Sequence, residues 1–196
     1  MWASKHFKKV YSIELSEQHW ASARANHSVH TNVEFLLGGS ATVMAGLVPR
    51  VDRPLFWLDA HWSGGDTAGV ENECPLLEEI DVIARSGVEP KVILIDDARL
   101  FLTPPPPPHR WNHWPDLGTV VLALGRCGDM YITVKDDVII AAPAAARADL
   151  VAFWRGQPWS TTYPLQRWRR RLGDRLRRRR FPGQSDMPRA NRPEEA

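Results

Sequence analysis

Cysteines and long apolar runs are scarce in this sequence, and each scarcity excludes a class of protein. Only Cys74 and Cys127 occur among the 196 residues, too few for a disulfide framework, so we expect reduced thiols in a cytoplasmic protein. The longest apolar run, residues 138–146, is interrupted by Pro143 and is much shorter than the roughly 20 residues that span a bilayer. Charged residues interrupt the N-terminus, so no signal-peptide pattern is present.

Positive charge is concentrated near the C-terminus. The net charge is only +2, but residues 167–180 contain nine arginines and one aspartate, so the rest of the chain is acidic by about 6 charges. With 43% hydrophobic and 24% charged residues, the composition is that of a globular protein. We expect an α/β domain over residues 1–155 and a disordered Arg- and Pro-rich tail over residues 156–196.

Short apolar runs alternate with helical patterns along the first 142 residues. Continuous apolar runs of this kind are typical of parallel strands buried on both faces. An Asp-Asp turn at 136–137 separates the last two runs and predicts an antiparallel hairpin. The order therefore predicts an α/β fold with a doubly wound, mostly parallel sheet and a terminal hairpin. The predicted strands are residues 10–15, 33–37, 55–58, 92–95, 130–134 and 138–141.

Serines and prolines mark the predicted helix ends. Ser16 is expected to cap the helix after the first strand, and Ser40 a short helix that Pro49 stops. A further helix over residues 75–85 has helical apolar spacing. Its buried face is expected to hold Leu76, Leu77, Ile80 and Ile83, with Glu78, Glu79 and Asp81 largely outside it.

Carboxylates stand at the ends of three predicted strands. Glu14 lies at the end of the first, Asp59 follows the third, and Asp96 and Asp97 follow the fourth. Ligands of open α/β sheets bind beyond the carboxyl ends of the strands, so we interpret these acids as a candidate site. The alternative is that strand ends lead into polar loops in any protein.

Four segments carry a resemblance to a known family, and together they extend over about residues 1–142. In order and spacing they resemble class I S-adenosylmethionine-dependent methyltransferases, which implies a Rossmann-like fold and S-adenosylmethionine as cofactor. The segments are Val-Tyr-Ser-Ile-Glu-Leu-Ser (10–16), Val-Glu-Phe-Leu-Leu-Gly-Gly-Ser (33–40), Phe-Trp-Leu-Asp-Ala-His-Trp (56–62) and Val-Ile-Leu-Ile-Asp-Asp-Ala-Arg (92–99).

The resemblance assigns cofactor contacts to four residues. Glu14 matches the acid that hydrogen-bonds the cofactor ribose, a role suited to a carboxylate that accepts from two hydroxyls. Gly38 and Ser40 flank Gly39, which stands where the family has an acid for the adenine amino group, and Asp59 completes the set.

The family's first strand and glycine-rich loop have no counterpart in this sequence, which begins in what looks like the end of the following helix. That strand normally lies between the strands predicted at 10–15 and 55–58. The resemblance therefore implies an N-terminally truncated domain.

The acids after the third and fourth predicted strands have a second match. Asp59, Asp96 and Asp97 look like the metal ligands of macrocin-type sugar O-methyltransferases, which implies a Mg²⁺ ion that lowers the pKa of a substrate hydroxyl. His61 would accept the proton as a general base or join the metal shell, with Asp59 beside it. The alternative for His61 is a loop histidine with only local hydrogen bonds.

Aromatic residues populate the two loops expected to roof this site, 62–73 and 98–114. They would contact a small-molecule or glycan hydroxyl acceptor, such as a sugar or phenol, or else fill the gap between loop and sheet. These residues are Trp62, Trp111, Trp114, His109 and His113.

The predicted function is metal-assisted O-methylation, provided that the missing first strand and glycine-rich loop are supplied, and two alternatives stay open. One is a methyltransferase-like fragment that has lost catalysis. The other is a nucleic-acid-binding protein that acts through the arginine-rich tail by non-specific polyanion binding, although such tails are often merely solvated.

Overall fold

A computed structural model describes residues 2–62 and 69–156. The chain divides into two units at residues 154 and 155, and every described strand belongs to the first of them, Met1–Trp154. The tail predicted over residues 156–196 lies, apart from Gly156, outside the described residues. None of the described helices is long and apolar enough to cross a membrane.

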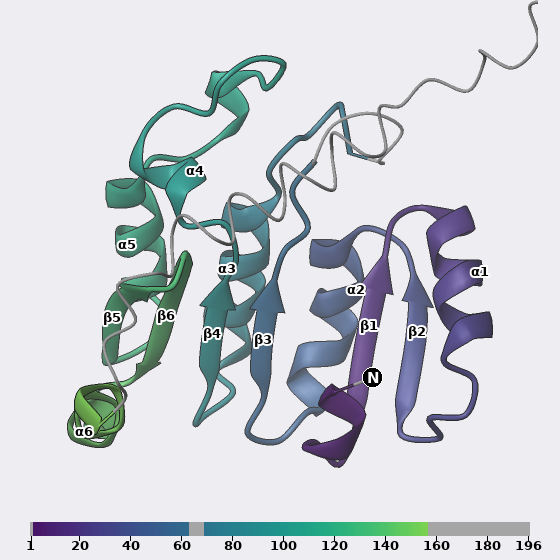
Figure 1. The fold of residues 1–196 in the computed structure, drawn as a ribbon, viewed down its shortest axis with the longest axis horizontal. Helices are drawn as coiled ribbons and strands as arrows, with labels where there is room; N and C mark the ends of the chain where they lie inside the picture. The colour runs from purple at the N-terminus through teal and green to yellow at the C-terminus, as the bar shows by residue number, and fades with distance from the viewer. Residues whose placement is uncertain (1, 63–68, 157–196) are drawn as a thin grey trace, which may run out of the picture. The chain divides into compact units, whose positions relative to one another are not determined.

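The fold is mixed α/β with strands in two sheets (Figure 1). Strands β1 (Val10–Glu14) and β2 (Val33–Leu37) form a parallel pair. The second sheet has the order β3-β4-β6-β5, in which only β6 runs against its neighbours. Its strands are β3 (Leu55–Leu58), β4 (Val92–Ile95), β5 (Met130–Lys135) and β6 (Val138–Pro143). The parallel strands and the antiparallel hairpin expected from the sequence are therefore confirmed.

Helices connect these strands in the predicted alternation. Helix α1 begins after Ser16, whose side chain accepts a hydrogen bond from the His19 amide at 3.3 Å, as predicted for a cap. The α-helices are α1 (Glu17–Asn26), α2 (Ser40–Leu47), α3 (Leu76–Ser86), α4 (Arg99–Leu102), α5 (Leu117–Gly125) and α6 (Arg147–Gly156). Single 3-10 turns are η1 (Ala3–Lys5), η2 (Val48–Arg50), η3 (Trp111–His113) and η4 (Ala144–Ala146).

The core lies where α3 and α5 cover one face of the four-stranded sheet. Ile80 and Ile83 of α3, Leu124 of α5, Ile93 of β4 and Ile139 of β6 are completely buried. Burial of such side chains contributes about 1.5–3 kcal/mol each. Because the helices pack on this face, the strand ends that carry the candidate site are held in position.

One edge of β1 and one edge of β3 have no strand partner within the described part of the chain. The Val10 amide donates to Asn32 on the β2 side, so the amides of Tyr11 and Ile13 point to the open edge. In β3 the Leu58 carbonyl accepts from the Asp96 amide on the β4 side. Because successive residues of a strand face opposite neighbours, the amides of Leu55 and Trp57 face the open edge of β3. The arrows of both strands point the same way in Figure 1.

Two local predictions are wrong, and both involve the same contact. Ser40 does not cap α2. Gly39 takes the cap position, and the Ser40 side chain instead hydrogen-bonds Glu79. Glu79 was expected largely outside the buried face of α3 but is only 2% exposed, because Ser40 supplies a polar partner there. The α-helix itself ends at Leu47, before Pro49, as predicted, and a 3-10 turn follows from Val48 to Arg50.

Candidate functional site

The predicted carboxylates lie where strands end at one edge of the fold. Glu14 is the last residue of β1, Asp59 follows β3, and Asp96 and Asp97 follow β4. Leu58 pairs with Ile95, and the Asp96 amide donates to the Leu58 carbonyl at 3.1 Å. This register places Asp59 and Asp96 side by side at the ends of neighbouring parallel strands.

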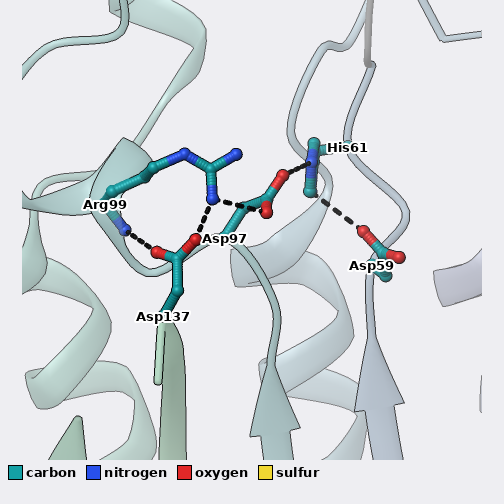
Figure 2. A network of polar contacts seen from close by, with 5 residues as sticks. All are labelled: Asp59, His61, Asp97, Arg99 and Asp137. Atoms are coloured by element: carbon teal, nitrogen blue, oxygen red, sulfur yellow. Dashed lines mark hydrogen bonds and ion pairs between the residues drawn. The ribbon is translucent and has the colours of Figure 1, made fainter. Parts of the chain in front are cut away.

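The imidazole of His61 lies between two of these carboxylates (Figure 2). Its Nε2 is 3.2 Å from Asp97 Oδ2, within hydrogen-bond distance, and its Nδ1 is 3.6 Å from Asp59 Oδ1. The His61 side chain is only 8% exposed, whereas Asp59 is 47% exposed. The structure therefore brings together Asp59, His61 and Asp97.

The other oxygen of Asp97 belongs to an ion pair that the sequence did not indicate. Asp97 Oδ1 accepts from Arg99 Nη1 at 2.7 Å, and the same Nη1 contacts Asp137 Oδ2 (Figure 2). Asp137 Oδ1 also accepts from the Arg99 amide at 3.0 Å. Asp97 and Asp137 have φ angles of +56° and +68°, a left-handed conformation that aspartate tolerates better than most residues.

Burial, hydrogen bonds and neighbouring charges shift the pKa values of Asp97, His61 and Asp59. Burial alone would raise the pKa of Asp97, but the hydrogen bonds from His61 and Arg99 hold that pKa well below its usual range. Burial lowers the pKa of His61, yet the bond to Asp97 and the charges of the nearby aspartates outweigh it and raise the pKa. The pKa of Asp59 is also raised, mainly by burial, while the charge of His61 opposes the shift.

These protonation states assign the two imidazole nitrogens. Because Asp97 is ionised at neutral pH, its oxygens can only accept hydrogen bonds, so His61 Nε2 carries the proton. Nδ1 is then the basic nitrogen of the neutral ring, and it faces Asp59. Asp59 can stabilise the imidazolium once Nδ1 has taken up a proton.

The residues predicted as magnesium ligands do not fit a metal ion in this arrangement. Across residues 2–62 and 69–156, no group of three or more His, Cys, Asp or Glu side chains is placed to hold one. Both oxygens of Asp97 already have nitrogen partners, His61 and Arg99. Asp96 lies near enough for its charge to influence Asp59 and His61, but it is not part of the contact network in Figure 2.

Of the four predicted cofactor residues, Asp59 belongs to this network, whereas Glu14, Gly38 and Ser40 lie at the ends of β1 and β2. Glu14 Oε1 accepts from the Ser16 amide at 2.8 Å, which fixes the carboxylate and leaves Oε2 available among the described residues. Gly38 has a φ of +144°, and an added Cβ there would meet Val43 Cγ2 at 3.0 Å. A Cβ at Gly39 would meet nothing nearer than Thr42 Oγ1 at 3.9 Å, so the backbone is accessible there.

The aromatic residues of the predicted roof separate into buried and exposed members. Trp62 and Trp114 are each 8% exposed, whereas Trp111 is 68% exposed. The Trp114 ring lies 5.4 Å from that of His61 and 5.2 Å from that of His109. Trp114 therefore covers His61, whereas Trp111 presents most of its surface to solvent.

Sequence reasoning missed Arg99, Asp137 and Glu73. Arg99 and Asp137 are 38 residues apart, and no local pattern links them. The Asp-Asp turn was recognised as a hairpin signal only. Glu73 lies in a loop without helical or strand periodicity, so no signal marked it as buried.

Comparison with known proteins adds no assignment. No protein-family model, no curated protein and no solved structure matches the chain. The function is therefore inferred from the motifs of the sequence and from the geometry of the site.

Proposed function

We propose that this protein has a Rossmann-like methyltransferase fold and transfers a methyl group from S-adenosylmethionine to a hydroxyl of a small molecule or glycan. The observation that carries the proposal is the His61 imidazole, held by Asp97 so that its basic nitrogen faces Asp59 at the carboxyl edge of the sheet. Ligands of doubly wound folds bind at that edge.

Strand order supports the finer fold assignment. One further strand between β1 and β3 would join the two sheets into the continuous order β2-β1-x-β3-β4-β6-β5. The resemblance to methyltransferases requires a central strand at that place. Ile13 of β1 packs against the same core that contains Leu58 of β3, as expected for strands separated by one such position.

The residues at the ends of β1 and β2 are suited to hold S-adenosylmethionine in part. Glu14 would accept hydrogen bonds from the ribose hydroxyls through its available oxygen, and the backbone at Gly38 and Gly39 would lie against the adenine. When bound, S-adenosylmethionine supplies an electrophilic methyl group. The Ser40 hydroxyl is already engaged by Glu79, so we assign the contact there to backbone atoms.

His61 would act as the general base for the acceptor hydroxyl. Its Nδ1 takes the hydroxyl proton, which makes the oxygen a better nucleophile for the methyl carbon. Asp97 keeps the proton of the neutral ring on Nε2, and Asp59 stabilises the imidazolium that forms. Arg99 balances the charge of Asp97, and no step of this proposal passes through a metal ion.

Cofactor binding tests the first half of the proposal. Saturation-transfer NMR with millimolar S-adenosylmethionine should give signals from the ribose protons in the wild-type protein. Glu14→Gln should weaken binding by about 1.5–3 kcal/mol, the range for hydrogen bonds to a charged group. Absence of ribose signals, or equal signals in Glu14→Gln, would refute the assignment.

Methyl transfer tests the second half. The protein is incubated with methyl-labelled cofactor and a pool of sugars and phenols, and labelled product is counted. His61→Gln should lose at least about 100-fold in rate, the lower range for general base catalysis, and keep the ribose signals. His19→Gln, an exposed histidine on α1, is the matched control. Equal rates in His61→Gln and wild type would remove His61 from the mechanism.

A further inference from the structure

Glu73 is a buried carboxylate that lies close to the proposed base and outside the network of Figure 2. Glu73 is only 1% exposed, and its oxygens face several nitrogens of the segment 109–114. They accept from the Arg110 amide at 3.0 and 3.2 Å and from Trp114 Nε1 at 3.0 Å. His109 Nδ1 is 3.4 Å from Glu73 Oε2.

These bonds join two loops that are far apart in the sequence. Trp114 is 41 residues from Glu73, and the Glu73 carbonyl also accepts from the Trp62 amide at 2.7 Å. The backbone of Glu73 thus binds Trp62, which follows His61 in the sequence, and the carboxylate of Glu73 binds the 109–114 segment. The Trp114 ring that results lies 5.4 Å from His61 and 5.8 Å from Phe101.

The negative charge of Glu73 is what these contacts require. Burial alone would raise the pKa of Glu73, but the hydrogen bonds from Trp114 and the Arg110 amide, together with the nearby His109 ring, outweigh it and lower the pKa. The Arg110 amide and Trp114 Nε1 are both donors, so a neutral amide in place of the carboxylate would set its own N–H groups against one of them. A buried donor without an acceptor is costly, so the segment would move.

We propose that Glu73 is a positioning residue that holds Trp114 over His61 and so limits access of water and acceptor to the proposed base. The role of this cover in catalysis rests on the proposed function, whereas the contact between Glu73 and Trp114 does not. Glu73 makes no contact with the reacting atoms. It acts through Trp114, and its loss should uncover a histidine that is now 8% exposed.

Chemical modification of His61 tests this inference in the full chain without cofactor or substrate. Diethylpyrocarbonate modifies accessible neutral imidazoles, and mass spectrometry gives the rate at each histidine. At pH 8, His61 should react slowly in the wild type and about tenfold faster in Glu73→Gln. The reason is that the loss of one hydrogen bond should shift the equilibrium toward an uncovered His61 by about this factor. His19 reports general reactivity, and Glu71→Gln, an exposed acid of the same loop, is the matched control.

A second variant keeps the test decisive if Glu73→Gln fails to fold. Trp114→Phe removes the indole N–H that donates to Glu73 and leaves a smaller aromatic ring, and it should also raise the His61 rate. If folded Glu73→Gln or Trp114→Phe leaves the His61 rate at the wild-type value, the positioning role is wrong. Because cofactor is absent, this outcome is independent of whether methyl transfer is detected.

Discussion

Arg99 pairs with Asp97 at 2.7 Å, at the end of β4 where the sequence predicted a magnesium ion. The guanidinium also contacts Asp137, so it lies between two carboxylates as a bound cation would. Charges of opposite sign at this distance make an external cation unnecessary for keeping Asp97 ionised. His61 then receives a carboxylate acceptor whose position is fixed from the other side.

This pairing predicts that magnesium will not stabilise the wild-type protein. Ligands that bind only the native state raise the melting temperature, and millimolar Mg²⁺ should leave the wild-type melting curve unchanged. In Arg99→Gln the carboxylates of Asp97 and Asp137 lose their cation, so Mg²⁺ should raise the melting temperature of that variant. Arg85→Gln, which breaks an exposed pair with Asp81 on α3, is the control. A magnesium-dependent gain in the wild type would restore the metal site.

The ion pair of His61 with Asp97 predicts a pH-dependent stability. The raised pKa of His61 means that its contribution is complete below the ordinary histidine value of about 6.5 and is lost as the pH rises past it. The lowered pKa of Asp97 means that its contribution is present above about 4 and is lost at lower pH. Urea unfolding should therefore show the largest difference between wild type and His61→Gln at about pH 5–6. A difference that is constant from pH 5 to pH 9 contradicts the ion pair.

Asp137 should stabilise the site through both its side chain and its backbone. Asp137→Asn keeps an oxygen for the Arg99 amide and tolerates a positive φ, so it should cost only about 0.5–1 kcal/mol, as for an exposed ion pair. Asp137→Ala loses the acceptor for Arg99 and the tolerance of a positive φ. It should therefore lower the free energy of unfolding by about 1–3 kcal/mol. Asp136→Ala, at a φ of +51°, controls for backbone strain and otherwise loses only an exposed ion pair with Lys135. Equal unfolding free energies for Asp137→Ala and Asp136→Ala would show that the Arg99 contact adds nothing.

Both cysteines should be inert in the native protein. Burial raises the pKa of Cys74 to about 12 and also raises the pKa of Cys127. Since the thiolate is the reactive form, a disulfide reagent at pH 8 should titrate both thiols only after unfolding in guanidinium. Rapid reaction of Cys74 in the native protein would contradict its burial.

Local patterns were sufficient to predict the strands and the acids at their ends. The apolar run at 92–95 and the Asp-Asp that follows it correspond directly to β4 and to the site residues Asp96 and Asp97. The hairpin followed from turn chemistry at Asp136 and Asp137, which both have positive φ. These features depend on neighbours within a few residues, so a short window of sequence is enough to predict them.

The partners of the acids could not be predicted in the same way. Helical spacing placed Glu79 outside the buried face of α3, but Ser40 meets it from another element. The same holds for Arg99 with Asp137 and for Glu73 with Trp114, which join residues 38 and 41 positions apart. Which cation neutralises a carboxylate depends on such tertiary contacts, and for this reason the pairing of Asp97 with Arg99 could not be predicted from local sequence.

The open edges of β1 and β3 have a consequence for amide hydrogen exchange. Along β1, the amides of Val10 and Ser12 face β2, whereas those of Tyr11 and Ile13 face the open edge. Along β3, the amide of Phe56 faces β4 and those of Leu55 and Trp57 face away from it. Exchange rates should therefore alternate residue by residue along each strand, with slow amides toward the paired neighbour and fast ones toward the open edge. Uniformly slow exchange along both strands would reveal that these edges are paired in solution.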